Sequence, residues 1–383
     1  MEEKEYGLVL AGGGTKGAYE VGIWKALCEM EINVTAIVGA SIGALNGALF
    51  LQNNFEETVK MYENIKIDNI MNVNGIDANK NIFDLSNIFN LAADYTKQKG
   101  IDNTPLREMI RKYVDMDKIY NSPIDFGLVT YSVKNKTPLQ VFKNEIPKEQ
   151  MEDYLLASSC FPIFKPQIIN GEEYYDGGLY DNIPSNMLIE KGYKNIIIAD
   201  IAGVGFSKKT VNKDIYVKVI SSSEDLGGTF EFNHERILNN IKLGYLDTMK
   251  SFNKLQGHIY YFKPEEFAKM LEAFNLQTIY GLEYAAQMYN MDRCKEYTFE
   301  EFIQELRNRH LEAEKTYVKI KDTNLFQIGK KLNKLFDKGL GICLAKDLYL
   351  DRPASKLSNY MFNFVKDYIV AAKALIELGN YMD

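Results

Sequence analysis

Within its first fifty residues the chain twice repeats one order: an apolar run, a glycine-rich turn and a helix-forming segment. The first unit runs from Tyr6–Ala11 through the turn 12–17 to Ala18–Met30. The second has an apolar run at 34–38, then Gly39-Ala40-Ser41-Ile42-Gly43 and another helix-forming stretch. Short apolar runs are typical of buried strands, and strands that alternate with helices form parallel sheets with helices on both faces. This beginning therefore predicts an α/β fold.

The alternation continues to about residue 205, and the character of the chain changes after Pro264. The strand candidates in the first part are Leu8–Ala11, Ala36–Gly39, Asp125–Ser132, Leu139–Phe142 and Asn195–Ala199. We expect Tyr216–Ser221 and His258–Phe262 to add two more strands to this sheet. Beyond Pro264 no strand pattern is evident, and long helical runs carry many aromatic residues. A chain of this length favours two domains. We predict an α/β domain at 1–263 and an α-helical region at 264–383.

Ser41 is the first candidate catalytic residue. Its pentapeptide matches the Gly-x-Ser-x-Gly turn between a strand and a helix that exposes a nucleophilic hydroxyl. Gly39 and Gly43 allow backbone angles and close approaches that a Cβ atom would block. The pentapeptide also occurs by chance, and a serine in an ordinary tight turn is the alternative.

The glycine-rich segment Gly12-Gly13-Gly14-Thr15-Lys16-Gly17 separates a strand candidate from a helix candidate. Backbone N–H groups in such a turn, at the positive end of a helix dipole, can bind a phosphate or a developing oxyanion. A dinucleotide site also requires an acidic residue after the next strand, where this chain has Gly39-Ala40-Ser41. A P-loop requires Gly-Lys-Ser/Thr, which is absent because Lys16 precedes Gly17. The oxyanion interpretation lacks no required residue.

Asp176 is the third candidate, at the end of a predicted β-hairpin. Pro166–Tyr175 reads as two short strands joined by Asn170-Gly171, a pair typical of two-residue turns. Asp176 follows the returning strand and precedes Gly177 and Gly178. An Asp-Gly pair alone is ordinary turn chemistry. The position at a strand end is what makes this carboxylate of interest.

In order and spacing, the glycine-rich segment, the Ser41 pentapeptide and Asp176-Gly177-Gly178 resemble the patatin-like phospholipase family. Ala157–Pro166 and Phe230–Phe252 are also similar to segments of that family, so the resemblance covers about residues 5–262. It implies a three-layer α/β/α fold with a mostly parallel central sheet, and identifies 1–263 as the catalytic domain. It gives little help with the C-terminal α-helical extension.

The resemblance also implies a role for each motif residue. Ser41 would be the nucleophile, and Asp176 would be its partner in a Ser–Asp dyad. The oxyanion hole would be formed by the amides of Gly12, Gly13 and Gly14, and Lys16 would support that loop. The implied substrates are phospholipids or related lipid esters.

A Ser–Asp dyad makes chemical sense only if its carboxylate is perturbed. A serine hydroxyl needs an adjacent base, and a free aspartate, with a pKa of about 3.9, is a poor base at neutral pH. Burial in an apolar cleft would raise that pKa. We therefore expect Asp176 to be buried beside Ser41.

A Ser-His-Asp triad is the competing arrangement. The three histidines of the chain, His234, His258 and His310, all follow Asp176, so the order Ser, Asp, His is possible. His310 lies in a charged helical segment, and we expect it on the solvated surface.

Composition narrows the possible partners. A net charge of −7 without a basic stripe argues against nucleic acid. Four scattered cysteines without Cys-x-x-Cys spacing fit reduced thiols and no zinc site, and we expect neither a metal ion nor a cofactor.

The acidic N-terminus is unlike a secretory signal, and the uncharged stretch between Glu31 and Glu56 reads as strand, turn and helix. These features predict a cytoplasmic protein with transient contact to a membrane surface, and they leave its oligomeric state open.

The sequence thus favours a serine acyl hydrolase that acts on lipid esters. Two alternatives remain: a general carboxylesterase or lysophospholipase that acts on more soluble acyl esters, and a non-catalytic lipid- or nucleotide-binding protein of the same fold. Head-group and acyl-position preferences cannot be read from the residues.

Overall fold

The computed structural model describes residues 4–72, 100–203, 205–206, 214–321, 338–351 and 359–382. The chain divides into two compact units, Met1–Thr248 and Met249–Asp383, and each is described by itself. This division falls earlier in the chain than the boundary after residue 263 that the sequence suggests, because the segment after residue 251 packs within the second unit.

The first unit is built around one sheet with the strand order β5-β6-β3-β2-β1-β7-β8, in which β4 pairs with β3. The pairs β1–β2, β1–β7, β2–β3 and β7–β8 are parallel, whereas β4 and the hairpin β5–β6 are antiparallel additions at one edge. The strands are β1 (Tyr6–Leu10), β2 (Val34–Ala40), β3 (Asp125–Ser132), β4 (Thr137–Phe142), β5 (Gln167–Ile169), β6 (Glu172–Asp176), β7 (Asn195–Asp200) and β8 (Tyr216–Ser221). The predicted α/β fold with a mostly parallel sheet is confirmed.

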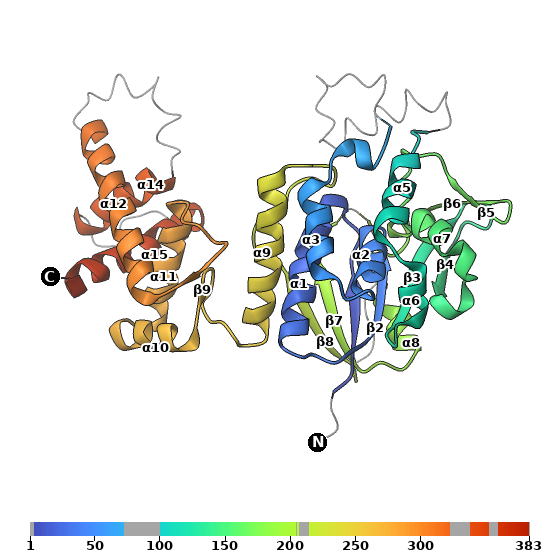
Figure 1. Ribbon diagram of the computed structural model, residues 1–383. Helices are drawn as coiled ribbons and strands as arrows, with labels where there is room; N and C mark the ends of the chain where they lie inside the picture. Colours follow the sequence, from blue (N-terminus) through green and yellow to red (C-terminus); the bar gives the residue numbers. More distant parts are fainter. Residues whose placement is uncertain are drawn as a thin grey trace. The chain divides into compact units, whose positions relative to one another are not determined.

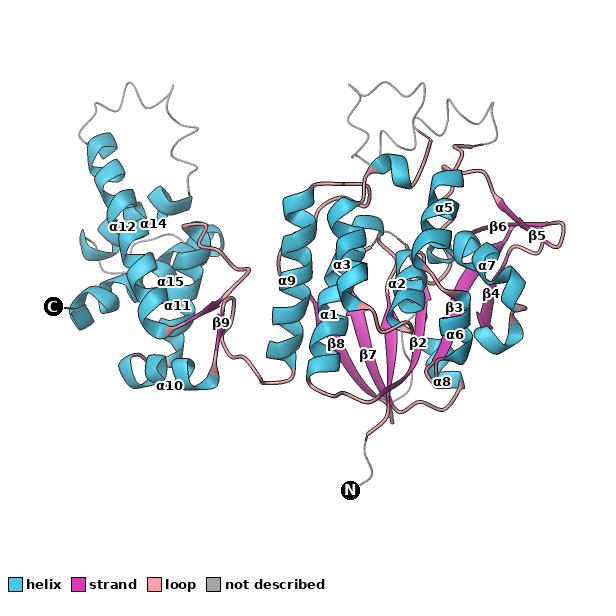
Figure 2. Cartoon of the chain, in the orientation of Figure 1, coloured by secondary structure: helices cyan, strands magenta, loops and turns pink. Residues whose placement is uncertain are grey.

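Helices cover this sheet on both faces, which is why its central strands read as continuous apolar runs. Leu8, Val9 and Leu10 are all fully buried, although successive side chains point to opposite faces. On one face, Leu188 of α8 packs with Val9 and with other residues of β1, β2 and β7, and Figure 2 shows α1, α2 and α3 on the other side of the strands. The helices of this unit are α1 (Ala18–Glu29), α2 (Ile42–Phe50), α3 (Phe55–Asn64), α5 (Thr104–Tyr113), α6 (Met116–Asn121), α7 (Met151–Ser158), α8 (Ser185–Glu190) and α9 (His234–Ser251), whose last residues belong to the second unit.

The prediction that His258–Phe262 extends the main sheet is wrong. Only Tyr261–Phe262 forms a strand, β9, and it pairs in parallel with β10 (Glu296–Tyr297) in a separate two-stranded sheet. Strand β10 also corrects the expectation that no strand lies beyond Pro264. Glu283 holds the segment before β9 within the second unit, because its carboxylate accepts hydrogen bonds from the amides of His258 at 2.9 Å and Tyr260 at 2.7 Å.

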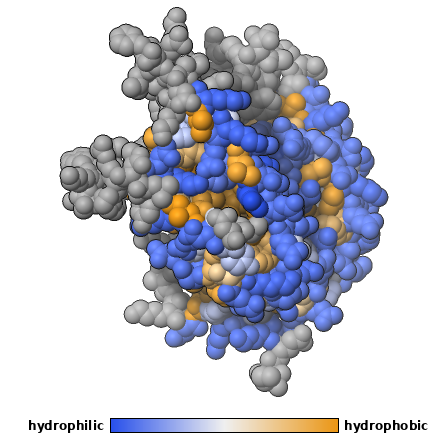
Figure 3. Space-filling view, turned by 90° about the vertical axis from the view of Figure 1, so that its left-hand side faces the viewer, coloured by the Kyte–Doolittle hydropathy of each residue, from blue (hydrophilic) through white to orange (hydrophobic). Residues whose placement is uncertain are grey.

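The other elements in the described part of the second unit are helices, as predicted. Its helices are α10 (Pro264–Ala273), α11 (Leu276–Met288), α12 (Phe299–Lys321), α14 (Lys338–Asp351) and α15 (Asn359–Met382). Aromatic residues that include Tyr260, Tyr297 and Phe302 form its buried core with aliphatic residues of α11 and α15. On the face drawn in Figure 3, hydrophobic residues are exposed in small areas between hydrophilic ones. None of the helices in the described part of the chain combines the length and apolar composition that crossing a bilayer requires.

Candidate active site

Ser41 lies at a sharp turn between β2 and α2, as the pentapeptide predicts. Its backbone adopts φ 55° and ψ −124°, a conformation that non-glycine residues rarely adopt and that marks local strain. The flanking glycines are required by close contacts. A Cβ atom on Gly39 would lie 2.4 Å from the carbonyl carbon of Gly43, and one on Gly43 would lie 2.3 Å from the carbonyl oxygen of Leu10.

Ser158, the last residue of α7, fixes this turn from the side. The backbone N–H of Ser41 donates to Ser158 Oγ at 3.1 Å, and that hydroxyl donates to the carbonyl oxygen of Val129 at 2.8 Å. Ser158 therefore ties the turn to strand β3. Local sequence patterns indicate no individual role for Ser158, because the two hydrogen-bonded segments are far apart in the chain.

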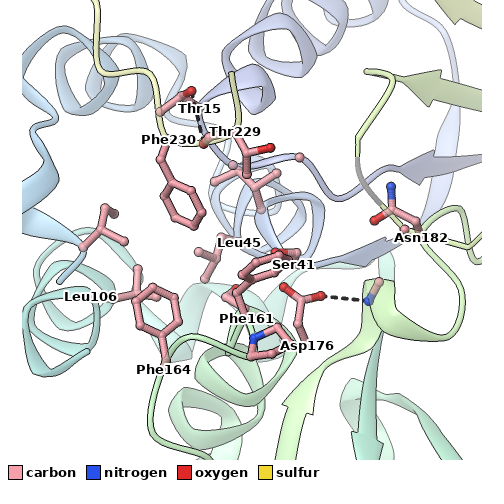
Figure 4. A pocket seen from close by; sticks show the side chains of 18 of the residues that line it. Thr15, Ser41, Leu45, Leu106, Phe161, Phe164, Asp176, Asn182, Thr229 and Phe230 are labelled. Atoms are coloured by element: carbon pink, nitrogen blue, oxygen red, sulfur yellow. Dashed lines mark hydrogen bonds between the residues drawn. The ribbon is translucent and has the colours of Figure 1, made fainter. Parts of the chain in front are cut away.

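Asp176 ends strand β6, and the predicted hairpin holds it there. Asn170 and Gly171 adopt φ 51° and 80°, the left-handed values of a two-residue hairpin turn. The Asp176 side chain is 4% exposed, and one of its oxygens, Oδ1, accepts the Gly178 N–H at 2.8 Å. The structure brings this carboxylate to the Ser41 side chain (Figure 4). Burial raises the pKa of Asp176 to about 6, although hydrogen bonds with Ser41 and with the Gly178 amide lower it.

The glycine-rich loop lies against the same site. Asn182 holds its first glycine by two hydrogen bonds: Gly12 N–H donates to the Asn182 carbonyl oxygen at 3.2 Å, and Asn182 Nδ2 donates to the Gly12 carbonyl oxygen at 3.0 Å. The amides of Gly13 and Gly14 make no hydrogen bond with another described residue. Gly14 has φ 62°, and a Cβ atom there would lie 2.0 Å from the carbonyl oxygen of Thr229.

Two contacts connect the loop to neighbouring segments. Lys16 Nζ donates to the carbonyl oxygen of Ala202, in the loop after β7, at 3.0 Å. Thr15 donates its N–H to the Thr229 carbonyl oxygen at 2.9 Å and its hydroxyl to the Gly228 carbonyl oxygen at 2.9 Å. Of these residues, the sequence singled out Lys16 but not Asn182, whose role depends on a contact across 170 residues.

A buried polar network lies beneath the loop. Glu20 of α1 is fully buried and accepts a hydrogen bond from Asn46 Nδ2 of α2 at 2.8 Å. The same Asn46 amide donates to the Gly17 carbonyl oxygen at 2.9 Å, and Asn46 Oδ1 accepts the Tyr62 hydroxyl of α3 at 2.9 Å. Burial raises the pKa of Glu20 well above its usual range. The network joins the loop, the helix that follows Ser41 and a wall of the cavity described next.

A cavity of about 310 Å³ opens beside Ser41 and Asp176. In Figure 4, Leu106, Phe161, Phe164 and Phe230 gather around this space, with Asn182 away from them beyond the two candidate catalytic residues. Among the described residues that line it, Asp176 and Tyr62 are the ionisable ones, and lysine, arginine and histidine are absent. The hydrophobic lining residues are Ile42, Leu45, Ile65, Ile70, Leu106, Phe161, Pro162, Phe164, Leu179, Phe206, Phe230 and Phe232.

None of the described residues that line this cavity is a histidine. His234, in the first unit, is exposed, and its Nδ1 lies 2.9 Å from the carbonyl oxygen of Glu63. His258 and His310 belong to the second unit, and none of the three lines the cavity. The expectation that His310 is a solvated surface residue is wrong, because it is 8% exposed and its Nδ1 lies 2.7 Å from the Tyr289 hydroxyl.

Comparison with known proteins points to one family. Residues 8–189 match the model of the family described as patatin-like phospholipase. The lysophospholipase NTE1 of Scheffersomyces stipitis is 26% identical over 308 residues, which cover 76% of this chain and 18% of that protein. The NTE1 lysophospholipase of Kluyveromyces lactis is 26% identical over 203 residues, which cover 52% of this chain and 13% of that protein.

Patatin-like phospholipase domain-containing protein 7 of Rattus norvegicus is 25% identical over 197 residues, which cover 51% of this chain and 13% of the rat protein. The matched part is thus less than a fifth of each of these three relatives. Among solved structures, VipD from Legionella pneumophila aligns with 14% identity and a TM-score of 0.42, over 99% of this chain and 90% of VipD.

Proposed function

We propose that this chain, whose residues 8–189 match the model of the patatin-like phospholipase family, is a serine acyl hydrolase that cleaves the ester bonds of lipids. One observation carries this proposal. The side chains of Ser41 and Asp176 meet at the polar end of a cavity whose other walls are largely hydrophobic. A hydroxyl beside a base, next to space for an acyl chain, is the arrangement that nucleophilic ester hydrolysis requires.

In the proposed reaction, Ser41 Oγ attacks the carbonyl carbon of the ester while Asp176 takes the hydroxyl proton. The carbonyl oxygen becomes an oxyanion, and the amides of Gly13 and Gly14 stabilise it. When the tetrahedral intermediate collapses, the bond to the alcohol oxygen breaks, and Asp176 returns the proton to the leaving alcohol. A water molecule then attacks the acyl-serine by the same sequence of proton transfers, which releases the fatty acid and restores Ser41.

The loop residues Gly12, Gly13, Gly14 and Lys16 have different roles in the proposed mechanism. The Gly13 and Gly14 amides are available as donors, whereas the Gly12 amide donates to Asn182. We therefore assign Gly12 to holding the loop together with Asn182, and Gly13 and Gly14 to the oxyanion. Lys16 supports the loop through the Ala202 carbonyl oxygen. Gly177 and Gly178 complete the turn that presents Asp176, since the Gly178 amide donates to its carboxylate.

The elevated pKa of Asp176 supports its role as a general base. A base works best when its pKa lies near the working pH. At a pKa of about 6, the carboxylate is mostly ionised at neutral pH and is still a better proton acceptor than an ordinary aspartate. A histidine is not needed in this scheme.

Monoacyl lipids are the favoured substrates within this class. Ligand cavities commonly measure about 300–1,000 Å³, and the cavity beside Ser41, at about 310 Å³, lies at the lower end. Such a volume suits a single acyl chain. The fungal relatives are named lysophospholipases, which also supports a monoacyl substrate.

We further propose that the mouth of the cavity contacts a lipid surface. Phe206 and Leu179 both line the cavity and are 75% and 38% exposed. Two backbone hydrogen bonds connect Phe206 to the turn after Asp176: its N–H donates to the Gly178 carbonyl oxygen at 3.2 Å, and its carbonyl oxygen accepts the Asn182 N–H at 2.6 Å. Exposed hydrophobic groups at a cavity mouth are typical of such contacts.

A fluorophosphonate probe tests the proposed activity. We expect wild-type protein to be labelled covalently, Ser41→Ala to remain unlabelled, and Ser222→Ala, a change in a loop outside the cavity lining, to be labelled like wild type. Hydrolysis of a p-nitrophenyl ester should follow the same pattern. Absence of both labelling and hydrolysis in wild type would favour a non-catalytic binding protein. A preference for p-nitrophenyl esters over lipid in vesicles would favour a general carboxylesterase.

A further inference from the structure

Leu106 forms the part of the cavity wall that comes from helix α5. The residue is 3% exposed and lines the cavity. In Figure 4 it lies on the opposite side of Ser41 and Asp176 from Asn182. Two of the ten residues of α5, Leu106 and Ile110, are buried. Hydrophobic packing therefore gives this part of the wall limited support, and its position depends on other contacts.

The side of α5 that faces α3 is loosely packed. Two cavities, of about 320 and 250 Å³, are lined by residues of both helices. Glu57 of α3 and Lys112 of α5 line the larger cavity, and Asn64 of α3 and Glu108 of α5 line the smaller one. Polar and charged residues thus face each other there across open space, so α3 supplies little of the packing that would hold α5 in place.

Arg107, the next residue along α5, connects this helix to two other elements. Its Nη1 donates to Glu152 and, at 2.8 Å, to Asp153 Oδ1, and both residues lie in the first turn of α7. Its Nη2 donates to Gln167 Oε1 of β5 at 3.0 Å. The side chains of Arg107 and Glu152 are 24% and 18% exposed. The planar guanidinium group fixes the direction of each of these hydrogen bonds, and so fixes α5 against α7 and β5.

The Glu152 carboxylate of this ionic cluster is charged at neutral pH. Partial burial favours a higher pKa for Glu152, but its hydrogen bonds with Arg111 and Arg107 keep that pKa below its usual value. Arg111, one turn further along α5, donates to Glu152 Oε2 at 2.8 Å with a side chain that is 62% exposed. Arg107 is the more buried of the two arginines, and it bonds β5 as well as α7.

The elements that Arg107 connects to α5 also position the candidate catalytic residues. Helix α7 ends at Ser158, which fixes Ser41, and β5 pairs with β6, whose last residue is Asp176. The wall at Leu106 is thus tied to the same elements that place the reacting groups. Because the separation between that wall and the reacting groups bounds the space for an acyl chain, a fixed wall limits the length of the chain.

We propose that Leu106 limits the length of the acyl chain that the cavity accepts, and that Arg107 is the positioning residue that holds Leu106 in place. This inference rests on the proposed function, because it places the ester carbonyl at Ser41 and the acyl chain along the hydrophobic wall. It adds the selection of acyl chains by length. A chain that ends short of Leu106 fits, whereas a longer one must displace a helix that the ionic cluster holds.

A series of p-nitrophenyl esters, from acetyl to dodecanoyl, tests this assignment. In wild type, kcat/KM should rise by up to about fourfold for each methylene group that the cavity buries. Beyond the optimal length it should fall by about 10- to 100-fold, the factor by which a tight hydrophobic pocket discriminates between chains of different length. Leu106→Ala should move the optimum to chains about two carbons longer, because the smaller side chain leaves space that the added groups fill.

Arg107→Met should instead weaken the length limit. Its side chain has a similar length and favours a helix but donates no hydrogen bond, so α5 can move, and the fall beyond the optimum should shrink to less than about threefold. Arg107→Lys, which keeps the charge but not the planar fork, should give an intermediate fall. The fall is a ratio measured within one variant, so a uniform loss of active protein does not change it. If Arg107→Met does not fold, Arg107→Lys and Leu106→Ala decide.

Arg111→Met is the matched control, since it removes an arginine of the same helix that bonds the same carboxylate. It should keep the optimum and the fall of wild type. An equally flattened profile in Arg111→Met would overturn the assignment to Arg107, and so would a wild-type fall in Arg107→Met and Arg107→Lys. An unchanged optimum in Leu106→Ala, or a flat profile in wild type, would overturn the length limit while leaving ester hydrolysis intact. If wild type hydrolyses none of these esters and resists the fluorophosphonate probe, the proposed function falls, and this inference falls with it.

Discussion

Each of the two units contains a buried carboxylate, and the two carboxylates have very different hydrogen-bond partners. Burial raises the pKa of both Asp176 and Glu283. In the second unit, Glu283 accepts hydrogen bonds from three consecutive backbone amides, those of His258, Ile259 and Tyr260. In the first unit, Asp176 accepts one backbone amide, contacts a serine hydroxyl and faces a cavity.

Burial and a shifted pKa therefore do not by themselves identify a reactive group. His310 makes the same point: burial lowers its pKa to about 4, yet its ring lies between the Tyr289 hydroxyl and Lys346 Nζ. In the second unit, these groups use their hydrogen bonds to hold helices and loops together. Around Ser41, by contrast, the Gly13 and Gly14 amides and the hydroxyls of Ser159 and Thr229 have no partner among the described residues. Unused hydrogen-bonding capacity beside a cavity marks the site.

The sharpest test exchanges each carboxylate for its amide. We expect Asp176→Asn to lower kcat/KM by about 10³–10⁴-fold, because the variant lacks the base. It should also unfold at a higher temperature at pH 7. The folded-state pKa of Asp176, about 6, lies above its ordinary value of 3.8, so the wild type loses stability as the pH rises through this window, by roughly 3 kcal/mol in all. The asparagine removes that loss.

Glu283→Gln should do the opposite. Glutamine removes the charge whose burial raises the pKa of Glu283, but its NH2 group would face backbone N–H groups that now donate to the carboxylate. We expect the lost hydrogen bonds to outweigh the removed charge, which gives about 1–3 kcal/mol of destabilisation with kcat/KM unchanged. Thermal unfolding and p-nitrophenyl ester hydrolysis measure both effects. If Asp176→Asn lost stability and Glu283→Gln lost activity, the contrast between the two carboxylates would be wrong.

The next largest effect concerns a glycine. Gly14→Ala should lower kcat by about 10²–10³-fold, the usual consequence of losing an oxyanion donor, because its Cβ atom would lie 2.0 Å from the Thr229 carbonyl oxygen and displace the loop. Gly171→Ala is the matched control, since Gly171 also has a positive φ but nothing lies within 4 Å of its Cβ position. That variant should lose about 1 kcal/mol of stability from backbone strain and keep its activity. Similar kcat losses in both would show that strain alone is responsible.

The turns that the sequence predicts correctly are those whose structure is decided locally. The turn at Ser41 follows from the close contacts of Gly39 and Gly43, and the hairpin before Asp176 follows from Asn170-Gly171. The convergence of Ser41 and Asp176 is not local, and it was expected only through the family resemblance.

The residues that the sequence missed, or placed wrongly, depend on long-range packing. Ser158 and Asn182 gain their roles from contacts across 117 and 170 residues. The segment before Phe262 was recognised as strand-like, but its partner β10 has only two residues and follows two helices. His310 stands in a charged helix, and neighbouring elements bury it. No local pattern carries such information.

The first unit contains a second buried carboxylate, Glu20, behind the glycine-rich loop. Its Oε2 accepts a hydrogen bond from Asn46, whereas its Oε1 has no hydrogen-bond partner. We expect Glu20→Ala to lower kcat roughly 10- to 100-fold, because small misplacements of the oxyanion loop and α2 strongly reduce the rate of the chemical step. Glu20→Gln should keep the hydrogen bond from Asn46 and retain activity. Since the folded-state pKa is raised, wild type loses stability as the pH rises above the unfolded pKa, and Glu20→Gln should unfold at a higher temperature than wild type at pH 7. Equal loss of kcat in both variants would mean that Glu20 works as a carboxylate.

The pH dependence of the wild type should follow Asp176. Only the ionised carboxylate can take the Ser41 proton, so kcat/KM should be constant above pH 7 and fall about tenfold for each pH unit below about 6. Rates of p-nitrophenyl ester hydrolysis between pH 4 and 8 measure this, with the fold monitored by circular dichroism at each pH. A rate that stays flat down to pH 4 would contradict a buried aspartate base.

The smallest expected effect lies at the cavity mouth, where the first unit exposes hydrophobic residues. Phe206→Ser should lower hydrolysis of lipid in vesicles about fivefold, because part of the aromatic surface would no longer leave water on contact with lipid, and should spare a soluble p-nitrophenyl ester. Tyr216→Ser is the matched control, since this aromatic residue of β8 is 50% exposed and does not line the cavity. It should change neither rate. Equal losses on both substrates in Phe206→Ser would mean that Phe206 shapes the acyl cavity and does not contact the lipid surface.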